Sequence, residues 1–212
     1  MRKHIITIAG NIGVGKSSLT QLLADELGWV AIFEAVEENP YLADFYRDMR
    51  TWSFHSQTFF LSRRLFQYRE MLDCAHSIVQ DRSIYEDAEI FARNLHLQGH
   101  LDGRDYDLYR QLYEGISLFL PVPTFLVYLR ASLETLQQRI ASRGRDYERA
   151  IDPAYIARLN ELYEEWIARF DRCPVLTIEV DGLDFVHRSD DGAQVVQRIR
   201  EMLRTTTVTQ SP

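Results

Sequence analysis

Residues 5–27 read IITIAGNIGVGKSSLTQLLADEL, and this stretch decides the fold. It opens on an apolar run, continues as a full GxxxxGKS pattern over residues 10–17, and ends in a segment of helical period. Glycines let successive backbone amides point at an anion, and the helix that follows adds the positive end of its dipole. The strand–loop–helix order therefore predicts a P-loop that binds a nucleoside triphosphate.

Each part of this loop has an expected task. We expect Lys16 to reach the outer phosphates and Ser17 to hold a magnesium ion, since these are the usual partners of such residues in P-loops. The residues expected to bind ATP are Gly10, Asn11, Ile12, Gly13, Val14, Gly15, Lys16, Ser17 and Ser18.

Outside the loop, short apolar runs alternate with longer stretches of helical period, which is typical of an α/β fold with a parallel sheet. Five strands are predicted, at 4–9, 29–33, 76–80, 124–129 and 175–180. The predicted helices cover 16–27, 41–49, 53–73, 84–97, 105–119, 132–142, 153–170 and 191–204. Pro153 suits the first turn of a helix capped by Asp152, and Pro174 suits the start of the last strand.

Composition limits what kind of protein this is. The 212 residues are 46% hydrophobic and 26% charged, which fits one domain over 1–204, followed by a polar, flexible tail at 205–212. A net charge of −7 argues against a protein that coats nucleic acid. No apolar run reaches the 18 residues that a membrane span needs. Two cysteines, Cys74 and Cys173, suggest neither a disulfide framework nor a zinc site, so we expect a reducing compartment, the cytoplasm.

Several classes of P-loop protein are excluded by missing motifs. There is no NKxD guanine motif, no LSGGQ signature of transporter ATPases, and no apolar strand that ends in a paired Asp-Glu. A kinase that acts on a small molecule remains.

Polar residues follow the second and third predicted strands, at the sheet edge where ligands bind in open parallel sheets. Glu34 could accept the proton of an attacking hydroxyl, although Glu34, Glu37 and Glu38 together also fit a solvated acidic loop. Asp81 could bind magnesium, and Arg82 could pair with Glu34 and orient it. The alternative is a plain salt bridge with a helix cap at Ser83.

Two further groups fit a second substrate. Gln57 and Arg64 share a helix face, as do Asp87 and Phe91, and such a set suits the edge and face of a heterocyclic base. Ordinary core packing is the alternative for the aromatic residues. An arginine-rich lid over the transferring phosphate is predicted around Gly144, with a solvated basic helix end as the alternative. Its members are Arg139, Arg143 and Arg145.

With these residues assembled, the chain resembles the deoxynucleoside kinase family, and more closely its bacterial deoxyadenosine and deoxyguanosine kinases. The resemblance covers nearly the whole chain and is carried by GNIGVGKS (10–17), Glu34, WSFHSQTFFLSRR (52–64), DRSIYED (81–87) and RGRDYE (143–148). It implies a P-loop kinase fold and ATP- and Mg²⁺-dependent phosphorylation of the 5'-hydroxyl of a 2'-deoxynucleoside to its monophosphate, in nucleotide salvage.

The resemblance also implies roles for single residues. Glu34 is the implied general base, Arg82 binds Glu34 and the 5'-oxygen, and Asp81 helps Ser17 to hold the metal. The implied substrate-binding residues are Tyr46 and Glu148 at the sugar 3'-hydroxyl, Gln57 and Phe91 at the base, and Arg64 with Asp87 as a charged pair that lines the base pocket.

The same comparison narrows the substrate. Thymidine-preferring members usually carry smaller residues in place of Arg64 and Asp87, so deoxyadenosine or deoxyguanosine is favoured, with deoxycytidine as an alternative. The sequence departs from vertebrate members at Ala35, where they have Pro, and at Asn39, where they often have Trp. Asp81 in place of Glu resembles the bacterial branch.

Two other functions and one assembly state remain open at this point. A nucleoside monophosphate kinase would phosphorylate a phosphate and would not need a carboxylate base. A scaffold that binds ATP without turnover is the third possibility. Apolar residues in the helices at 53–73 and 105–119, together with the resemblance, predict a homodimer, although these positions could instead face the chain's own core.

Overall fold

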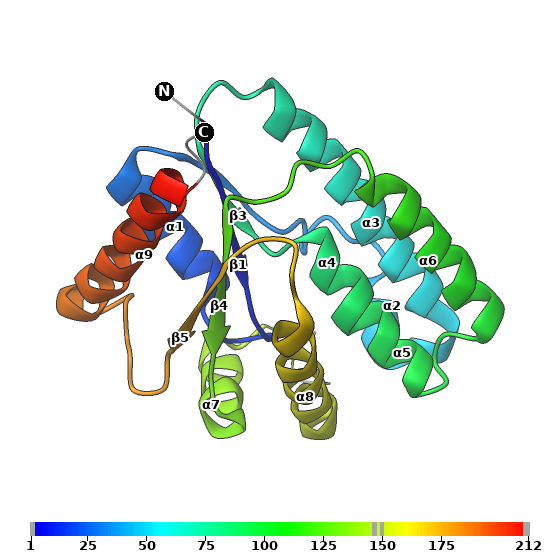
Figure 1. Cartoon of the computed structure of the whole chain (residues 1–212). Coiled ribbons are helices and arrows are strands. Elements are labelled where there is room, and N and C mark those ends of the chain that lie inside the picture. The colour runs from blue at the N-terminus through cyan, green and yellow to red at the C-terminus, as the bar shows by residue number, and fades with distance from the viewer. Residues whose placement is uncertain (1–2, 146–147, 149–150, 210–212) are drawn as a thin grey trace.

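The computed structural model describes residues 3–145, 148 and 151–209. Its five strands form the predicted parallel sheet, and their order in it is β2-β3-β1-β4-β5 (Figure 1). The strands are β1 (Ile5–Ala9), β2 (Val30–Ile32), β3 (Ile78–Asp81), β4 (Phe125–Arg130) and β5 (Val175–Glu179). Every residue of β1 is buried, which is the burial of a central parallel strand covered on both faces.

Helices cover both faces of this sheet. On one face lie α1 (Lys16–Leu27) and α9 (Ser189–Thr209), which contact each other and the strands beneath them (Figure 1). On the other face, α8 (Pro153–Arg169) stacks its Tyr163 ring on Tyr128 of β4. Asp152 caps α8 through the amide of Ala154, so the predicted cap before Pro153 is confirmed.

The lobe on this second face is built from the remaining helices. Its helices are α2 (Leu42–Arg47), α3 (Met49–Asp73), α4 (Ile84–Glu86), the π-helix η1 (Asp87–Ala92), α5 (Arg93–Leu97) and α6 (Gly103–Ser117). The helix predicted over 84–97 is therefore interrupted by a wider turn at 87–92, a feature that is frequent at functional sites and has no local sequence signal. Helix α7 (Leu133–Arg143) follows β4 and ends on Gly144.

The carboxyl end of the chain differs from the prediction. Instead of a flexible tail from 205, α9 continues through Thr209. The hydroxyls of Thr205 and Thr206 donate to the carbonyl of Met202, and Thr206 is buried. These hydroxyl groups thus bond to carbonyls within the helix, and α9 extends past the predicted helix end at 204, while 210–212 lie outside the described residues.

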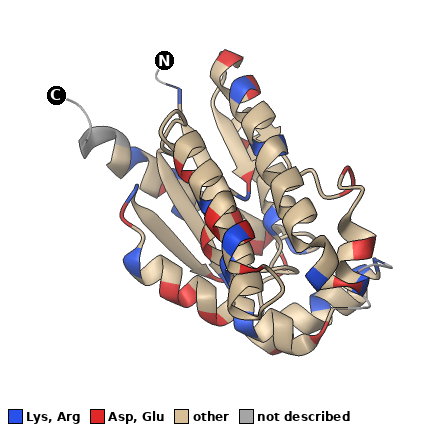
Figure 2. Cartoon of the chain, turned by 90° about the vertical axis from the view of Figure 1, so that its right-hand side faces the viewer, with Lys and Arg blue, Asp and Glu red and all other residues tan. Residues whose placement is uncertain are grey.

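The surface of the helices carries charged residues of both signs. Basic residues lie interspersed with acidic ones over the side shown in Figure 2. Over the stretches that the structure describes, we find no helix whose length and hydropathy would let it cross a bilayer.

Candidate active site

The P-loop follows β1 and wraps the first turn of α1. Gly13 has a φ of +84°, and a Cβ there would lie 2.7 Å from Cγ1 of Ile140, so a larger residue has neither the backbone freedom nor the space. The loop is also fixed from outside, since the Asn11 side chain donates to the carbonyl of Ile156 and to Oδ1 of Asn160 on α8. The predicted strand, loop and helix are all present.

Lys16 lies folded over this loop. Its Nζ donates to the carbonyl of Asn11 at 3.1 Å, and the side chain is buried. Burial, reinforced by the nearby Arg82 cation, lowers the pKa of Lys16 to about 8. An anion in the loop would stabilise this charge, which is the behaviour expected of a phosphate-binding lysine.

Two oxygen-bearing side chains meet where the loop faces β3. The Ser17 hydroxyl donates to Oδ2 of Asp81 at 2.5 Å, and Oδ1 of Asp81 is buried without a hydrogen-bond partner among the described residues. Magnesium takes oxygen ligands, is usually held by one or two carboxylates plus substrate phosphates, and keeps several waters. The pair fits that donor set, and within the described ranges no group of three or more His, Cys, Asp or Glu residues forms a cage of its own.

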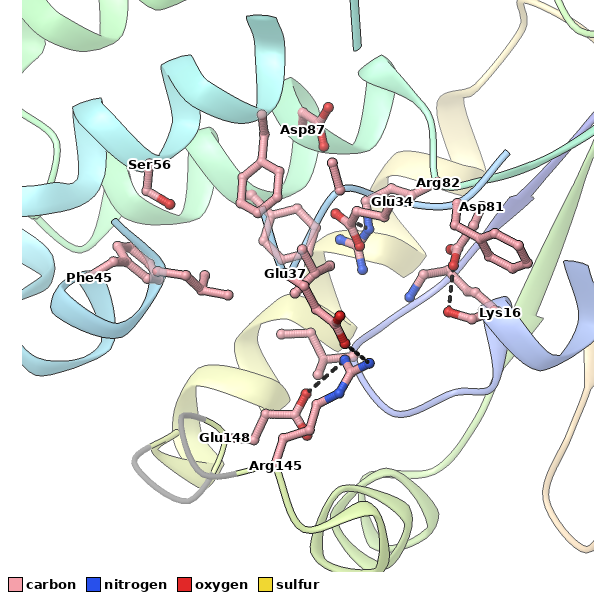
Figure 3. A pocket seen from close by; sticks show the side chains of 18 of the residues that line it. Lys16, Glu34, Glu37, Phe45, Ser56, Asp81, Arg82, Asp87, Arg145 and Glu148 are labelled. Atoms are coloured by element: carbon pink, nitrogen blue, oxygen red, sulfur yellow. Dashed lines mark hydrogen bonds and ion pairs between the residues drawn. The ribbon is translucent and has the colours of Figure 1, made fainter. Parts of the chain in front are cut away.

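Glu34 lies just beyond β2 and faces the same space (Figure 3). Its Oε1 is 3.1 Å from Nε of Arg82 and 3.6 Å from Nη2 of Arg64, so the ion pair expected with Arg82 is present. Burial alone would raise the pKa of Glu34, but Arg82, Arg64, Lys16 and Arg145 outweigh it and hold that pKa below its ordinary value. The carboxylate is therefore charged and able to accept a proton.

The acidic run thus divides into two kinds of residue. The side chain of Glu34 is 15% exposed, whereas that of Glu37 is 85% exposed, and Glu38 pairs with Arg63 at the surface. Glu34 is therefore not a solvated loop acid, whereas Glu37 and Glu38 are largely exposed at the edge of the same pocket.

Arg82 has an unusual backbone. Its φ of +64° makes it the one residue other than glycine with a positive φ in the described part of the chain. Its amide extends the sheet by donating to the carbonyl of Ile8, and its guanidinium lies 4.3 Å from the centre of the Phe91 ring. The αL conformation of an arginine costs roughly 1–2 kcal/mol of conformational free energy, so the surrounding contacts must hold the Arg82 backbone in it.

These groups open into a pocket of about 420 Å³, a size suited to a small molecule. Gln57 of α3 and Asp87 and Phe91 of η1 form one wall, as predicted from their helix faces. The Gln57 amide makes no hydrogen bond with the side chains and backbone that the structure describes, so its donor and acceptor are available to a ligand. Phe45, Ser56, Phe60 and Tyr155 also line the pocket and were not predicted.

Arg64 supports this wall from behind. Its Nε donates to Oδ2 of Asp87 at 2.9 Å, and its Nη1 donates to the carbonyl of Asp81. Burial would lower the pKa of Arg64, but Asp87 and Glu34 outweigh that effect and raise it. The predicted charged pair is therefore present, with only Asp87 at the pocket surface.

Tyr46 and Glu148 lie at another side of the pocket. Burial, with Tyr155, Glu148 and Glu34 adding to it, raises the pKa of Tyr46 well above its usual value, so the phenol remains a hydrogen-bond donor. Glu148 is buried and accepts a hydrogen bond at 3.0 Å from Nε of Arg143. Arg145 bridges Glu148 and Glu37 across the pocket (Figure 3).

The three arginines of the predicted lid do not lie together. Arg143 and Arg145 line the pocket, but Arg139 donates to the carbonyls of Val14, Val180 and Leu183. Although Arg139 and Arg143 are four residues apart on α7, the first extends to carbonyls beside the P-loop and the second turns to Glu148. The expectation that Arg139 belongs to the same cluster is wrong in this structure.

One buried carboxylate was missed by the sequence analysis. Glu86 accepts hydrogen bonds from the amides of Gly10 and Ser83 and from the hydroxyl of Tyr163. The signal was available, because Ser83-x-x-Glu86 is a capping-box pattern, although that pattern does not predict a contact with the P-loop.

Comparison with known proteins gives a consistent result. The model of the family described as deoxynucleoside kinase matches residues 6–204. The chain is 38% identical over 204 residues to a deoxyadenosine/deoxycytidine kinase of Bacillus subtilis, with 95% of this chain and 94% of that protein covered. It is 33% identical to a deoxyguanosine kinase of the same organism, with 93% and 97% covered. A solved structure of deoxyadenosine kinase from M. mycoides, with products dCMP and dCDP bound, is 29% identical, superposes with a TM-score of 0.83, and covers 93% of this chain and 99% of that one.

Proposed function

Because this chain belongs to the deoxynucleoside kinase family, we propose that its pocket binds a purine 2'-deoxynucleoside, with deoxycytidine as the alternative. Members of this family are phosphotransferases, and the chain accordingly converts nucleosides to monophosphates. The observation that carries the proposal is the position of Glu34. A charged carboxylate, held by Arg82, lines the same pocket as Lys16 and Ser17 of the P-loop.

Phosphoryl transfer depends on positioning and charge neutralisation more than on covalent chemistry. In the proposed mechanism, Glu34 accepts the proton of the 5'-hydroxyl while Arg82 orients that carboxylate and contacts the 5'-oxygen. Lys16 and the P-loop amides bind the phosphates of ATP. Magnesium, when bound by Ser17 and Asp81, would neutralise phosphate charge.

The choice of base is proposed from the pocket wall. The free amide of Gln57 can pair with the edge of a base, and Phe91 offers one ring face because Arg82 covers the other. The Arg64–Asp87 pair fills the space that a thymine methyl group would need. The names of the relatives, which include deoxyadenosine, deoxyguanosine and deoxycytidine kinases, support this choice.

The sugar and the transferred phosphate occupy the other side of the pocket in this proposal. Tyr46 donates to the 3'-hydroxyl and Glu148 accepts from it. Arg143 and Arg145 lie at the end of α7, beside Glu148, and are the two arginines we propose to close over the phosphate. Arg139 is removed from that role because its guanidinium is already bound by three carbonyls.

We further propose that the protein is a homodimer in the cytoplasm. Large apolar side chains of α3 and α6, two helices in contact, lie exposed. They are Leu65, Phe66, Leu72, Leu108 and Leu112. A second copy of this face would cover them, and a sedimentation mass of one chain at micromolar concentration would contradict the dimer.

A phosphorylation panel tests the proposal. ATP, magnesium and each of the four deoxynucleosides and matching ribonucleosides are supplied, and monophosphate formation is measured. We expect the highest kcat/KM with a purine deoxynucleoside and the lowest with thymidine. Turnover of deoxynucleoside monophosphates instead of deoxynucleosides would identify a monophosphate kinase, and ATP binding without any deoxynucleoside-dependent ADP release would identify a scaffold.

A further inference from the structure

Glu86 is a buried carboxyl side chain with no place in the mechanism above. It is fully buried and does not line the substrate pocket. Its Oε1 accepts from the Gly10 amide at 3.2 Å and from the Tyr163 hydroxyl at 2.8 Å, and its Oε2 accepts from the Ser83 amide at 2.9 Å and the Ser83 hydroxyl at 3.3 Å. The two amides can only donate, so each oxygen of this carboxyl group accepts a hydrogen bond from one of them.

Helix capping accounts for part of this arrangement. Ser83 and Glu86 form the capping box at the start of the helical segment that begins with α4. Capping does not require the other two contacts, since Gly10 belongs to the P-loop and Tyr163 belongs to α8. The carboxylate therefore joins three separate elements: the start of the P-loop, the turn after β3, and α8.

One of these contacts lies next to the strained residue of the site. Arg82 is in the αL conformation, and the next amide along the chain, that of Ser83, is held by Glu86. On the other side, the Arg82 amide is held by Ile8 of β1, two residues before Gly10. Through Gly10 and Ser83, the carboxylate therefore ties the end of β1 to the end of β3 at the place where Arg82 must keep its unfavourable backbone.

We propose that Glu86 is a positioning residue for phosphoryl transfer, which fixes the Arg82 turn against the start of the P-loop so that Arg82 orients Glu34. This inference rests on the proposed function of Glu34 and Arg82. Without the carboxylate, the backbone at Arg82 is free to leave the αL region, and its guanidinium moves away from Glu34, while Gln57, Tyr46 and Glu148 keep their places in the nucleoside pocket.

The substitution Glu86→Gln tests this inference. Its NH₂ group cannot accept a hydrogen bond, so either Gly10 or Ser83 loses its partner while the volume is unchanged. Because displacement of a positioning contact by about 1 Å can cost 10²-fold in rate, we expect kcat to fall by roughly tenfold to a hundredfold. KM for the deoxynucleoside should stay within about twofold, since Glu86 does not line the pocket.

Tyr163→Phe is the matched control. It removes one donor to the same carboxylate but leaves the contacts with Gly10 and Ser83. Its kcat should stay within about twofold of wild type even where its melting temperature falls. A loss of kcat equal to that of Glu86→Gln would overturn the assignment, because the contact with α8 would then carry the effect.

Other outcomes are equally decisive. If Glu86→Gln lowered the melting temperature but kept wild-type kcat well below the transition, Glu86 would be structural only and the proposal would be wrong. If that variant did not fold, Glu86→Asp would replace it, since its shorter side chain keeps the carboxyl group but cannot span Gly10 and Ser83. An unchanged kcat in Glu86→Asp would also refute the positioning role of Glu86. Wild-type turnover of a deoxynucleoside, measured in the same assay, tests the proposed function separately.

Discussion

Replacing Glu34 by Gln removes the proposed base while keeping the size of the side chain. General bases contribute about 10²–10⁴ in rate, so kcat should fall by that factor, which corresponds to about 3–5 kcal/mol of transition-state stabilisation. The substitution also removes the negative partner of Arg82 and Arg64, at 3.1 and 3.6 Å. Since a buried charged group that loses its partner costs about 1–3 kcal/mol, the melting temperature should fall as well.

The two effects can be separated in one experiment. Single-turnover rates with saturating ATP and deoxynucleoside are measured at least ten degrees below the melting temperature of each variant. Glu26→Gln is the control, since it removes an acid of α1 that pairs with Arg200 at the surface and does not line the pocket, and its rate should stay within about twofold of wild type. A rate for Glu34→Gln within about fivefold of wild type would show that the assigned base is wrong.

Three further predictions follow from the geometry. The pKa of Glu34 is held below its ordinary 4.5 because Arg82, Arg64, Lys16 and Arg145 outweigh burial. The ion pairs of Glu34 therefore stabilise the fold above about pH 4.5, and this stabilisation is lost as the pH falls through the lower folded-state pKa. A limb of the kcat/KM profile between pH 5 and 7 that Glu34→Gln abolishes would contradict this. Gly13→Ala should weaken ATP binding by at least about tenfold in calorimetric titration, because its Cβ meets Ile140 and its φ is positive. Asp81→Asn should raise the magnesium concentration for half-maximal activity by about tenfold or more, and an unchanged magnesium requirement would remove Asp81 from the metal site.

The parallel sheet could be predicted because its strands are short apolar runs beside strong local signals. The P-loop glycines, Pro153 after Asp152, and Pro174 before β5 each constrain the chain within a few residues. What the sequence could not predict depends on contacts between distant segments. The π-helix at 87–92 and the extension of α9 to Thr209 have no signal within their own residues strong enough to distinguish them from an ordinary helix or a polar tail.

The site was predictable to the same extent. Glu34, Asp81 and Arg82 follow strands, and parallel strands bring their carboxyl ends to one edge, so their meeting follows from topology. Arg139 could not be distinguished from Arg143 by helix position, because residues four apart lie on one face of a helix. The neighbouring loops decide that Arg143 bonds to Glu148 while Arg139 bonds to the carbonyl of Val14. Glu86 has a local signal for its cap but none for its contact with Gly10.

The strain at Arg82 is balanced by the contacts that surround it. Glycine at this position would relieve roughly 1–2 kcal/mol of backbone strain, but it would remove the cation that pairs with Glu34 and covers Phe91. The chain keeps the arginine because hydrogen bonds from both sides, through Ile8 and Glu86, fix the turn. Those bonds belong to the ends of β1 and β3 and not to a substrate, so the chain's own backbone supplies the contacts that hold Arg82 against Glu34.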